Sequence, residues 1–279
     1  MTFEDFAKAY GLMLNHVVFG KWVAVPTEDH PRKRNGRYKL MGNVGWVQNW
    51  ATMTKPEMWR SDVTKTPTID WQREQRVADQ ERIEAARRAA QRAGWIMHQT
   101  ESTHHAYLAK KGFPDEMANV WDNDGEKLLV VPMRMENRLV GAQLITEEGK
   151  KKFLPGQKTK GASFVLDAKG VPIFVEGYAT ALSVRAAMKA MKIRYTIHVC
   201  FSAGNIKAVA GMVPGGVVVA DKDLNGVGEA AARETGKPYW VSDAVGEDFN
   251  DFYIRVGLFH ATASLRKFLV ENAKDSIAS

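Results

Sequence analysis

Acidic residues follow several apolar runs in the second half of the chain. Glu176 comes directly after the run 171–175, and Asp221 and Asp223 end the run "VVVADKD". Asp248 follows the last short run, "PYWV", after a few residues. Carboxylates that lack cysteine or histidine partners favour hard cations such as Mg²⁺ or Mn²⁺, which leave coordination positions open for phosphate oxygens. The pattern therefore indicates phosphoryl transfer assisted by two metal ions.

The elements that position these acids can be read from the same part of the chain. From residue 171 onward, the β-branched apolar runs "VPIFV", "YTIHVCF", "GGVVVADKD" and "PYWVSD" alternate with stretches of helical pattern. Such alternation is typical of a parallel sheet covered by helices on both faces, whose strands bring their carboxyl ends to one edge. We therefore expect the acids to converge there. For any single aspartate, a role as helix cap or turn residue remains the alternative.

Residues 1–60 have a different character. The segment "FEDFAKAYGLML" has helical spacing, and short apolar runs broken by Gly, Pro and Asn-Gly then predict a small β-rich module. Several tryptophans lie close to a group of basic residues in this module. These basic residues are Arg32, Lys33, Arg34, Arg37 and Lys39. Bases stack on aromatic rings and phosphates attract cations, so the group suits DNA binding, and a solvated hairpin above an aromatic core is an equal alternative.

The middle of the chain predicts a connecting helix and a basic hairpin region. Residues 71–93 combine frequent alanine with alternating charges, as long solvated helices do. The runs 128–133 and 139–145 predict two strands joined by a turn at Asn137. The lysine-rich segment that follows, "GKKKFLPGQKTKG", suits phosphate binding, and it is also what an ordinary solvated hairpin looks like.

Composition limits the possible classes of protein. The 279 residues carry a formal net charge of +7, which favours a polyanionic partner. Cys200 is the single cysteine, so neither an internal disulfide nor a cysteine-based zinc site is possible, and no zinc is expected. No apolar run has the length of a membrane helix, and the N-terminus lacks the pattern of a signal peptide. We expect a soluble cytoplasmic protein (in the host cytoplasm if phage-encoded) without a membrane partner.

Three segments resemble the motifs of the Toprim domain, which topoisomerases and bacterial-type primases share. They are "VEGYATALSV", "ADKDLNGVGEAAA" and "GEDFNDF", and their form is similar to that in Toprim primases of phages and plasmids. Upstream, "VVPMRMENRLVGAQLI" and "KKFLPGQKTKGASFVL" resemble the basic RNA-polymerizing subdomain of those primases. The resemblance covers roughly residues 105–255. One departure is Thr180, which stands where bacterial primases often carry an aspartate.

The resemblance implies roles for individual residues. The implied catalytic acids are Glu176, as general base or metal-organising group, Asp221 and Asp223. The implied metal ligands, for two Mg²⁺ or Mn²⁺ ions, are Glu176, Asp221, Asp223 and Asp248. The residues implied to hold the incoming nucleotide or the template are Arg134, Lys152, Lys158, Lys160 and Asn205.

The implied fold class is α/β, with a Toprim parallel-sheet domain at 169–257. A basic α+β RNA-polymerizing subdomain at 105–168 precedes it, and a C-terminal helix at 258–279 follows. The β-rich module at 1–60 occupies the position of a zinc ribbon without cysteine ligands. A helical connector at 61–104 joins this module to the rest.

The function implied by the resemblance is that of a DNA primase. It would make short RNA primers on a single-stranded DNA template from ribonucleoside triphosphates during phage or plasmid replication. A separate chain would supply the replicative helicase, because the sequence has no G-x-x-x-x-G-K-[ST] segment. The alternatives are a Toprim nuclease that cleaves DNA or RNA and a non-catalytic nucleic-acid-binding protein. The basic segment favours the primase, because a nuclease has no triphosphate to hold.

Overall fold

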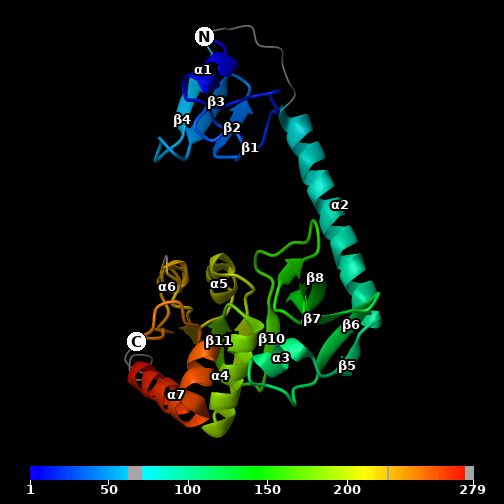
Figure 1. The fold of residues 1–279 in the computed structure, drawn as a ribbon, viewed down its shortest axis with the longest axis vertical. Helices are drawn as coiled ribbons and strands as arrows, with labels where there is room; N and C mark the ends of the chain where they lie inside the picture. Colours follow the sequence, from blue (N-terminus) through cyan, green and yellow to red (C-terminus); the bar gives the residue numbers. More distant parts are fainter. Residues whose placement is uncertain (62–70, 225, 274–279) are drawn as a thin grey trace. The chain divides into compact units, whose positions relative to one another are not determined.

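The chain folds into two compact units in the computed structural model, which describes residues 1–61, 71–224 and 226–273. The units are Met1–Ile83 and Glu84–Ser279 (Figure 1). Each unit has a hydrophobic core of its own. Part of the predicted connector, 62–70, and the end of the predicted C-terminal helix, 274–279, lie outside the described residues. The division of the chain into the five predicted segments remains a prediction.

The first unit contains a small antiparallel sheet with a helix on one face. Its elements are α1 (Phe3–Ala9), β1 (Val23–Val25), β2 (Gly36–Met41), β3 (Val44–Asn49) and β4 (Glu57–Arg60), with the strands in the order β1-β2-β3-β4. The Thr2 side chain and Asp5 form a capping box that begins α1. Phe3 of this helix packs its ring against Tyr38 and Trp59, which closes the core on that face. The β-rich pattern of the sequence agrees with this sheet.

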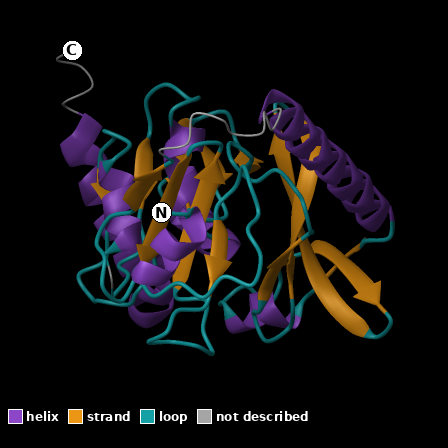
Figure 2. Ribbon diagram, turned by 90° about the horizontal axis from the view of Figure 1, so that it is seen from above, coloured by secondary structure: helices purple, strands orange, loops and turns teal. Residues whose placement is uncertain are grey.

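The boundary between the units falls within a long helix, and a second antiparallel sheet follows that helix in the second unit. The elements are α2 (Trp71–His98), β5 (Glu101–Thr103), α3 (Ala106–Lys110), β6 (Ala118–Asn123), β7 (Glu126–Met135), β8 (Arg138–Ile145) and β9 (Lys151–Phe153). The sheet has the order β5-β6-β7-β8-β9. The C-terminal half of α2 lies along this sheet (Figure 2), and its Ala93 and Ile96 pack against Trp121 and Leu128. The predicted connector helix and the two predicted strands are present.

A third sheet carries the predicted acids. Its elements are β10 (Phe164–Asp167), β11 (Val171–Val175), α4 (Tyr178–Ala190), β12 (Tyr195–Val199), α5 (Ala203–Ala210), β13 (Val217–Val219), α6 (Val227–Arg233), β14 (Tyr239–Trp240) and α7 (Phe249–Ala273). The strand order is β10-β12-β11-β13-β14. Alternate residues of each strand face opposite sides, so Ile173 and Val175 pack with α4 and α7, whereas Phe174 packs with α5 and α6. The predicted α/β class is confirmed.

The sheet is parallel except at one edge. β11 runs parallel to both β12 and β13, and β14 runs parallel to β13, as the alternating pattern predicts. β10 instead runs antiparallel to β12, so the expectation of a purely parallel sheet was wrong at this edge. An edge strand pairs on one side only, and the exposed residues of β10 alternate with partly buried ones. Its apolar residues 164–166 form a run as short as β13, and from the sequence we assigned them to the preceding subdomain at 105–168.

The last helix, α7, lies beside α4 (Figure 1) and is kinked at Gly257, where φ is 77°. Such a φ belongs to the left-handed region that glycine adopts without steric cost. Within the described part of the chain, none of the helices combines the length and apolarity that crossing a membrane requires.

Candidate active site

The strand register brings the predicted acids to one edge of the third sheet. Val175 of β11 is paired with Val219 of β13, so Glu176 leaves the sheet beside the residues that lead into Asp221. The backbone of Lys222 then donates to the carbonyl of Glu247 and accepts a hydrogen bond from Gly246. This second pairing holds the segment that ends in Asp248 alongside the loop after β13. The sequence prediction of convergence at the carboxyl ends thus has a direct structural basis.

Asp221 has the least ordinary environment of these acids. Its Oδ1 atom is buried and has no hydrogen-bond partner among the described residues. Burial raises the pKa of this carboxyl group to about 8, and the neighbouring charges of Asp248, Glu176 and Asp223 add to the increase. A buried carboxylate without a partner is costly, so this arrangement calls for a cation or a proton.

Glu176 is partly buried just after β11. Burial raises the pKa of its carboxyl group, and the negative charge of Asp223 acts in the same direction. The positive charge of Lys151 and a hydrogen bond from the backbone amide of Ala203 oppose this increase. A carboxylate with a raised pKa is a better proton acceptor near neutral pH than an ordinary surface glutamate.

Asp223 and Asp248 also have structural roles. Oδ2 of Asp223 accepts a hydrogen bond of 2.8 Å from the amide of Gly228, in the first turn of α6. Oδ1 of Asp248 accepts one of 2.8 Å from the amide of Asp251, at the start of α7. The cap or turn role that the sequence left open is therefore present at both residues: Asp248 caps α7, and Asp223 stabilises the turn that leads into α6. It does not account for Asp221, since that side chain caps nothing among the described residues.

The donor chemistry of the cluster fits a hard divalent cation, although its geometry is not that of a finished metal site. In the described residues, no three His, Cys, Asp or Glu side chains are placed so that they could hold one ion. The negative charges of Asp223 and Asp248 nevertheless help to raise the pKa values of Glu176 and Asp221, and one buried oxygen lacks a partner among the described residues. The raised pKa values and the unpartnered oxygen fit oxygen ligands whose charge repulsion a cation would relieve.

Lys151 is a site residue that the sequence reasoning missed. Its charge lowers the pKa of both Glu176 and Asp221. A Cβ atom added to Gly177 would lie 3.7 Å from its Nζ, so the ammonium group reaches the turn that follows Glu176. The sequence signal was the run of three lysines at 150–152, and periodicity alone does not show which of them faces the acids.

Strand geometry separates Lys151 from its neighbour Lys152, the residue that the resemblance selects. Successive side chains of β9 point to opposite faces. The ring of Phe153 contacts Phe201, in the loop after β12, so Lys151 shares that face. Lys152 is exposed on the opposite face, where Leu154 packs into the cluster beside α2.

Arg134 lies where the basic loop ends. Its backbone exchanges two hydrogen bonds of 2.9 Å with Ser163, just after a register shift between Met133 and Arg134. The guanidinium group is exposed, and its Nη1 donates to the carbonyl of Asn137. The backbone of Arg134 is therefore attached to the end of the loop that contains Lys158 and Lys160, while its side chain reaches the turn at Asn137.

Both of these loop lysines are exposed, while a neighbouring glutamine orders the backbone that carries them. Oε1 of Gln157 accepts hydrogen bonds from the amides of Ala142 and Leu154, and its Nε2 donates to the sulfur of Met133. The loop is thus attached to β8, and its cations remain available to an anionic ligand.

Asn205 fixes the end of the same loop. Its Nδ2 donates to the carbonyls of Ala162 and Cys200, both at 2.8 Å, and its Oδ1 accepts from the amide of Gly161 at 2.7 Å. The side chain is only 5% exposed. Its polar groups are already used, which favours a role in positioning the loop rather than in contacting the nucleotide.

The segment 248–250 contains both a site residue, Asp248, and two residues that pack against the rest of the unit. Phe249 is fully buried and packs edge-on against Trp240. Nδ2 of Asn250 donates to Ser183 of α4 and to the carbonyl of Lys111. These contacts attach the start of α7 to the rest of the unit and thereby hold Asp248 in place.

The predicted DNA-binding residues of the first unit fall into two groups. Arg32, Lys33 and Arg34 are exposed in the loop before β2. Arg37 and Lys39 lie within β2, on the face opposite Tyr38 and Leu40, which are buried against α1. The first group belongs to a loop and the second to a sheet surface.

The chain is related in sequence to DNA primases. It is 28% identical over 191 residues to the DNA primase TraC of Escherichia coli, a match that covers 66% of this chain and 12% of TraC. The predicted resemblance to primases of the phage and plasmid type is confirmed by this comparison. The chain spans about an eighth of the length of that relative.

A solved structure that contains primase domains also matches part of the chain. Among solved structures, one match is a bacteriophage T7 complex of the lagging-strand DNA polymerase with primase domains of two gp4 subunits, bound to an RNA/DNA hybrid and dTTP. That match has a TM-score of 0.42 and 17% identity, and covers 61% of this chain and 91% of the other. No family model matches the chain.

Proposed function

We propose that this protein is a DNA primase that joins ribonucleotides on a single-stranded DNA template in phage or plasmid replication. The observation that carries this proposal is the buried carboxyl group of Asp221, whose Oδ1 has no partner among the described residues, beside three other acids at the end of the sheet. The sequence relationship to a DNA primase supports it. The third sheet and its helices would form a Toprim domain, and the second sheet would form the basic RNA-polymerizing subdomain.

The acid cluster would hold the divalent cations of the reaction. The residues that would bind Mg²⁺ or Mn²⁺, as two ions, are Glu176, Asp221, Asp223 and Asp248. When bound, these ions would stabilise charge on the transferred phosphate and acidify the attacking hydroxyl group.

The reaction is a nucleotidyl transfer. The 3′-hydroxyl oxygen of one ribonucleotide forms a bond to the α-phosphorus of the next, and the bond from that phosphorus to pyrophosphate breaks. The hydroxyl proton passes to a carboxylate oxygen of Glu176 that no cation occupies, and burial, which raises the pKa of this group, favours its role as proton acceptor. Pyrophosphate carries the displaced electron pair away.

Basic side chains would bind the triphosphate and the template backbone. Lys151 lies close enough to the acids to contact the reacting phosphate. Arg134, Lys158 and Lys160 would bind the remaining phosphates from the loop that Asn205 holds. Lys152, on the other face of β9, would contact the template. Positioning of this kind supplies much of the rate of phosphoryl transfer, because the reacting atoms must lie in line.

The first unit would bind the template, with Arg32, Lys33 and Arg34 contacting its phosphates and Arg37 and Lys39 contributing from β2. A separate replicative helicase would work beside this chain on the same strand.

One assay separates the primase from a nuclease that uses the same acids. The purified protein is incubated with single-stranded DNA, labelled ribonucleoside triphosphates and Mg²⁺ or Mn²⁺, beside an Asp221→Ala variant. Short labelled RNA that disappears in the variant supports the proposal. Shortened DNA that depends on Asp221 would instead identify a nuclease. Bound but unchanged DNA, with neither product, would indicate a binding protein and contradict catalysis.

A further inference from the structure

The first unit presents an open sheet face opposite α1. Tyr38 and Leu40 of β2 are buried on the α1 side, so Arg37 and Lys39 point to the other side. Trp46 of β3 lies directly opposite Lys39 in the antiparallel register and shares this open face. A tryptophan and a lysine are therefore neighbours on the sheet face opposite α1.

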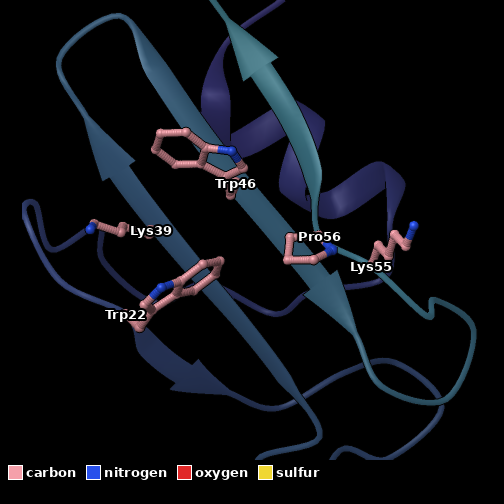
Figure 3. A pocket seen from close by; sticks show the side chains of 5 residues that line it. All are labelled: Trp22, Lys39, Trp46, Lys55 and Pro56. Carbon is pink, nitrogen blue, oxygen red and sulfur yellow. The ribbon is translucent and has the colours of Figure 1, made fainter.

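This face contains a hollow of about 450 Å³. Its lining residues are Trp22, Lys39, Trp46, Lys55 and Pro56. Figure 3 shows the indole rings of Trp22 and Trp46 on either side of the hollow, with Lys39 at one rim and Pro56 and Lys55 at the other. The volume is within the range of small-ligand sites, and its walls are mainly aromatic and aliphatic.

One of the two rings is held in position by its neighbours. The guanidinium group of Arg37 lies 4.4 Å from the ring centre of Trp22, and its Nε donates a 3.0 Å hydrogen bond to Gln48. Trp22 nevertheless remains 40% exposed. A flat aromatic surface that is both exposed and fixed binds a second flat ring at little cost in side-chain entropy.

The charges of the hollow select an anion. Within the described residues, neither Lys39 nor Lys55 forms a salt bridge, so both charges are available. Residues 1–61 as a whole carry nine Lys and Arg against five Asp and Glu. A ligand that fits must combine a flat ring with flanking negative charge, and a nucleotide within a single strand has both.

We propose that this hollow is a base-stacking site for single-stranded DNA. A base stacks on Trp22 and Trp46, and the flanking phosphates contact Lys39 and Lys55. This proposal rests on the proposed function, because the ligand is the DNA template. It adds that the template binds on the sheet face and not only at the loop that contains Arg32 and Arg34. The protein would then bind the strand through the ring of a base as well as through the charges of the phosphates.

Equilibrium binding by the full chain tests the site. Fluorescence anisotropy is measured with a labelled oligothymidylate of about 12 nucleotides, a length within the usual site size of such surfaces, and with an abasic strand of equal length. Neither ribonucleotides nor divalent cations are present, so the experiment measures DNA binding independently of primer synthesis. We expect the abasic strand to bind about tenfold more weakly or worse, because stacking is lost while the phosphates remain.

The variants are Trp22→Ala, Trp46→Ala and the double variant Lys39→Ala/Lys55→Ala, with Trp95→Ala as an exposed-tryptophan control from the other unit. The first two should each lose about tenfold or more in affinity for oligothymidylate but little for the abasic strand. The lysine variant should lower the slope of log K against log salt by about 1 to 2.

Three results would overturn the proposal: equal binding of both strands, unchanged binding by both tryptophan variants, or an equal loss in Trp95→Ala. If Trp46→Ala proves misfolded by circular dichroism, Trp22→Ala decides alone, because its exposed ring contributes little to the core.

Discussion

The environment of Asp221 does not favour folding, because a carboxyl group is buried there without a hydrogen-bond partner for its Oδ1 among the described residues. Its carboxyl group has a pKa of about 8 in the folded chain, against 3.8 for an ordinary aspartate. Between these two pH values the folded protein binds a proton that the unfolded chain has lost. The free energy of unfolding of the metal-free protein therefore falls as pH rises from about 4 to about 8. A bound cation would reverse this loss, which links stability to the proposed function.

Asp221→Asn tests this linkage. In EDTA at pH 8 the variant should be more stable than the natural protein by at least about 1 kcal/mol, or ~2 to 4 °C in melting temperature, because the amide carries no charge to bury. At pH 4 the difference should vanish. Added Mg²⁺ should stabilise the natural protein more than the variant.

Thermal denaturation at both pH values, with and without Mg²⁺, measures these differences, and Asp115→Asn is the exposed control. A variant that is less stable than the natural protein at pH 8, or one that Mg²⁺ stabilises equally, would show that Asp221 is an ordinary structural residue.

Lys151 and Lys152 form a matched pair for a second prediction. Lys151→Ala should lower kcat/KM for ribonucleotide joining by about 10-fold or more, because it removes the cation beside the acids. Lys152→Ala should have a smaller effect on this parameter and a larger one on template affinity. Loss of Lys151 also raises the pKa values of Glu176 and Asp221, so the acid limb of the pH–rate profile should move to higher pH. Equal effects, or a larger one at Lys152, would contradict the strand geometry.

At the scale of elements, the turn between β13 and α6 positions the metal-binding acids. A Cβ atom at Gly228 would lie 2.5 Å from the carbonyl oxygen of Asp221 and 3.0 Å from Oδ2 of Asp223. The start of α6 therefore packs directly on the acidic loop, and only glycine permits this approach. The position of α6 therefore determines the position of the acidic loop.

Gly228→Ala is expected to displace this loop. Mg²⁺-dependent activity should fall by about 10-fold or more, since the acids must hold their geometry closely, while the melting temperature should change much less than the activity does. Gly204→Ala, in α5, is the matched control, because a Cβ atom there meets nothing within 4 Å. Steady-state kinetics beside thermal denaturation separate the two effects. Normal activity in Gly228→Ala would mean that the acidic loop tolerates displacement.

The sequence predicted the elements that have strong apolar patterns. β11, β12, β13 and the helices between them were expected from the β-branched runs, and the convergence of the acids followed from parallel pairing. β10 was not expected in this sheet, because its apolar residues 164–166 were assigned to the preceding subdomain, and only the pairing with β12 shows where they belong.

The choice between Lys151 and Lys152 could not be made from sequence. It depends on which face of β9 meets the loop at Phe201, and that contact joins residues far apart in the chain. The hydrogen bonds that occupy Asn205 were likewise invisible, because its partners are backbone groups, two of which belong to the distant residues Gly161 and Ala162. Motif resemblance selects residues well, and only tertiary contacts assign their orientation.

At the scale of the whole molecule, the two units are expected to fold separately. The core of the first unit is built from residues of 3–59, and the three other clusters are built from residues of 84–279. A fragment of residues 71–279 should therefore unfold cooperatively. It should retain Asp221-dependent catalysis but lose about 10-fold or more in template affinity, together with the basic residues of 1–61.

Circular dichroism melts and anisotropy measurements on the fragment check both expectations. A fragment that is unfolded, or one that binds the template as tightly as the full chain, would show that stability or recognition is distributed differently between the units.

The most direct test of the account is the stoichiometry of the reaction at the acid cluster. Pyrophosphate and new phosphodiester bonds are quantified together, with single-stranded DNA, ribonucleoside triphosphates and Mg²⁺ or Mn²⁺, for the natural protein and for Asp221→Asn. We predict one pyrophosphate for each bond formed, and loss of both products in the variant. Strand cleavage without pyrophosphate, or bond formation that survives Asp221→Asn, would contradict a nucleotidyl-transfer site built on these acids.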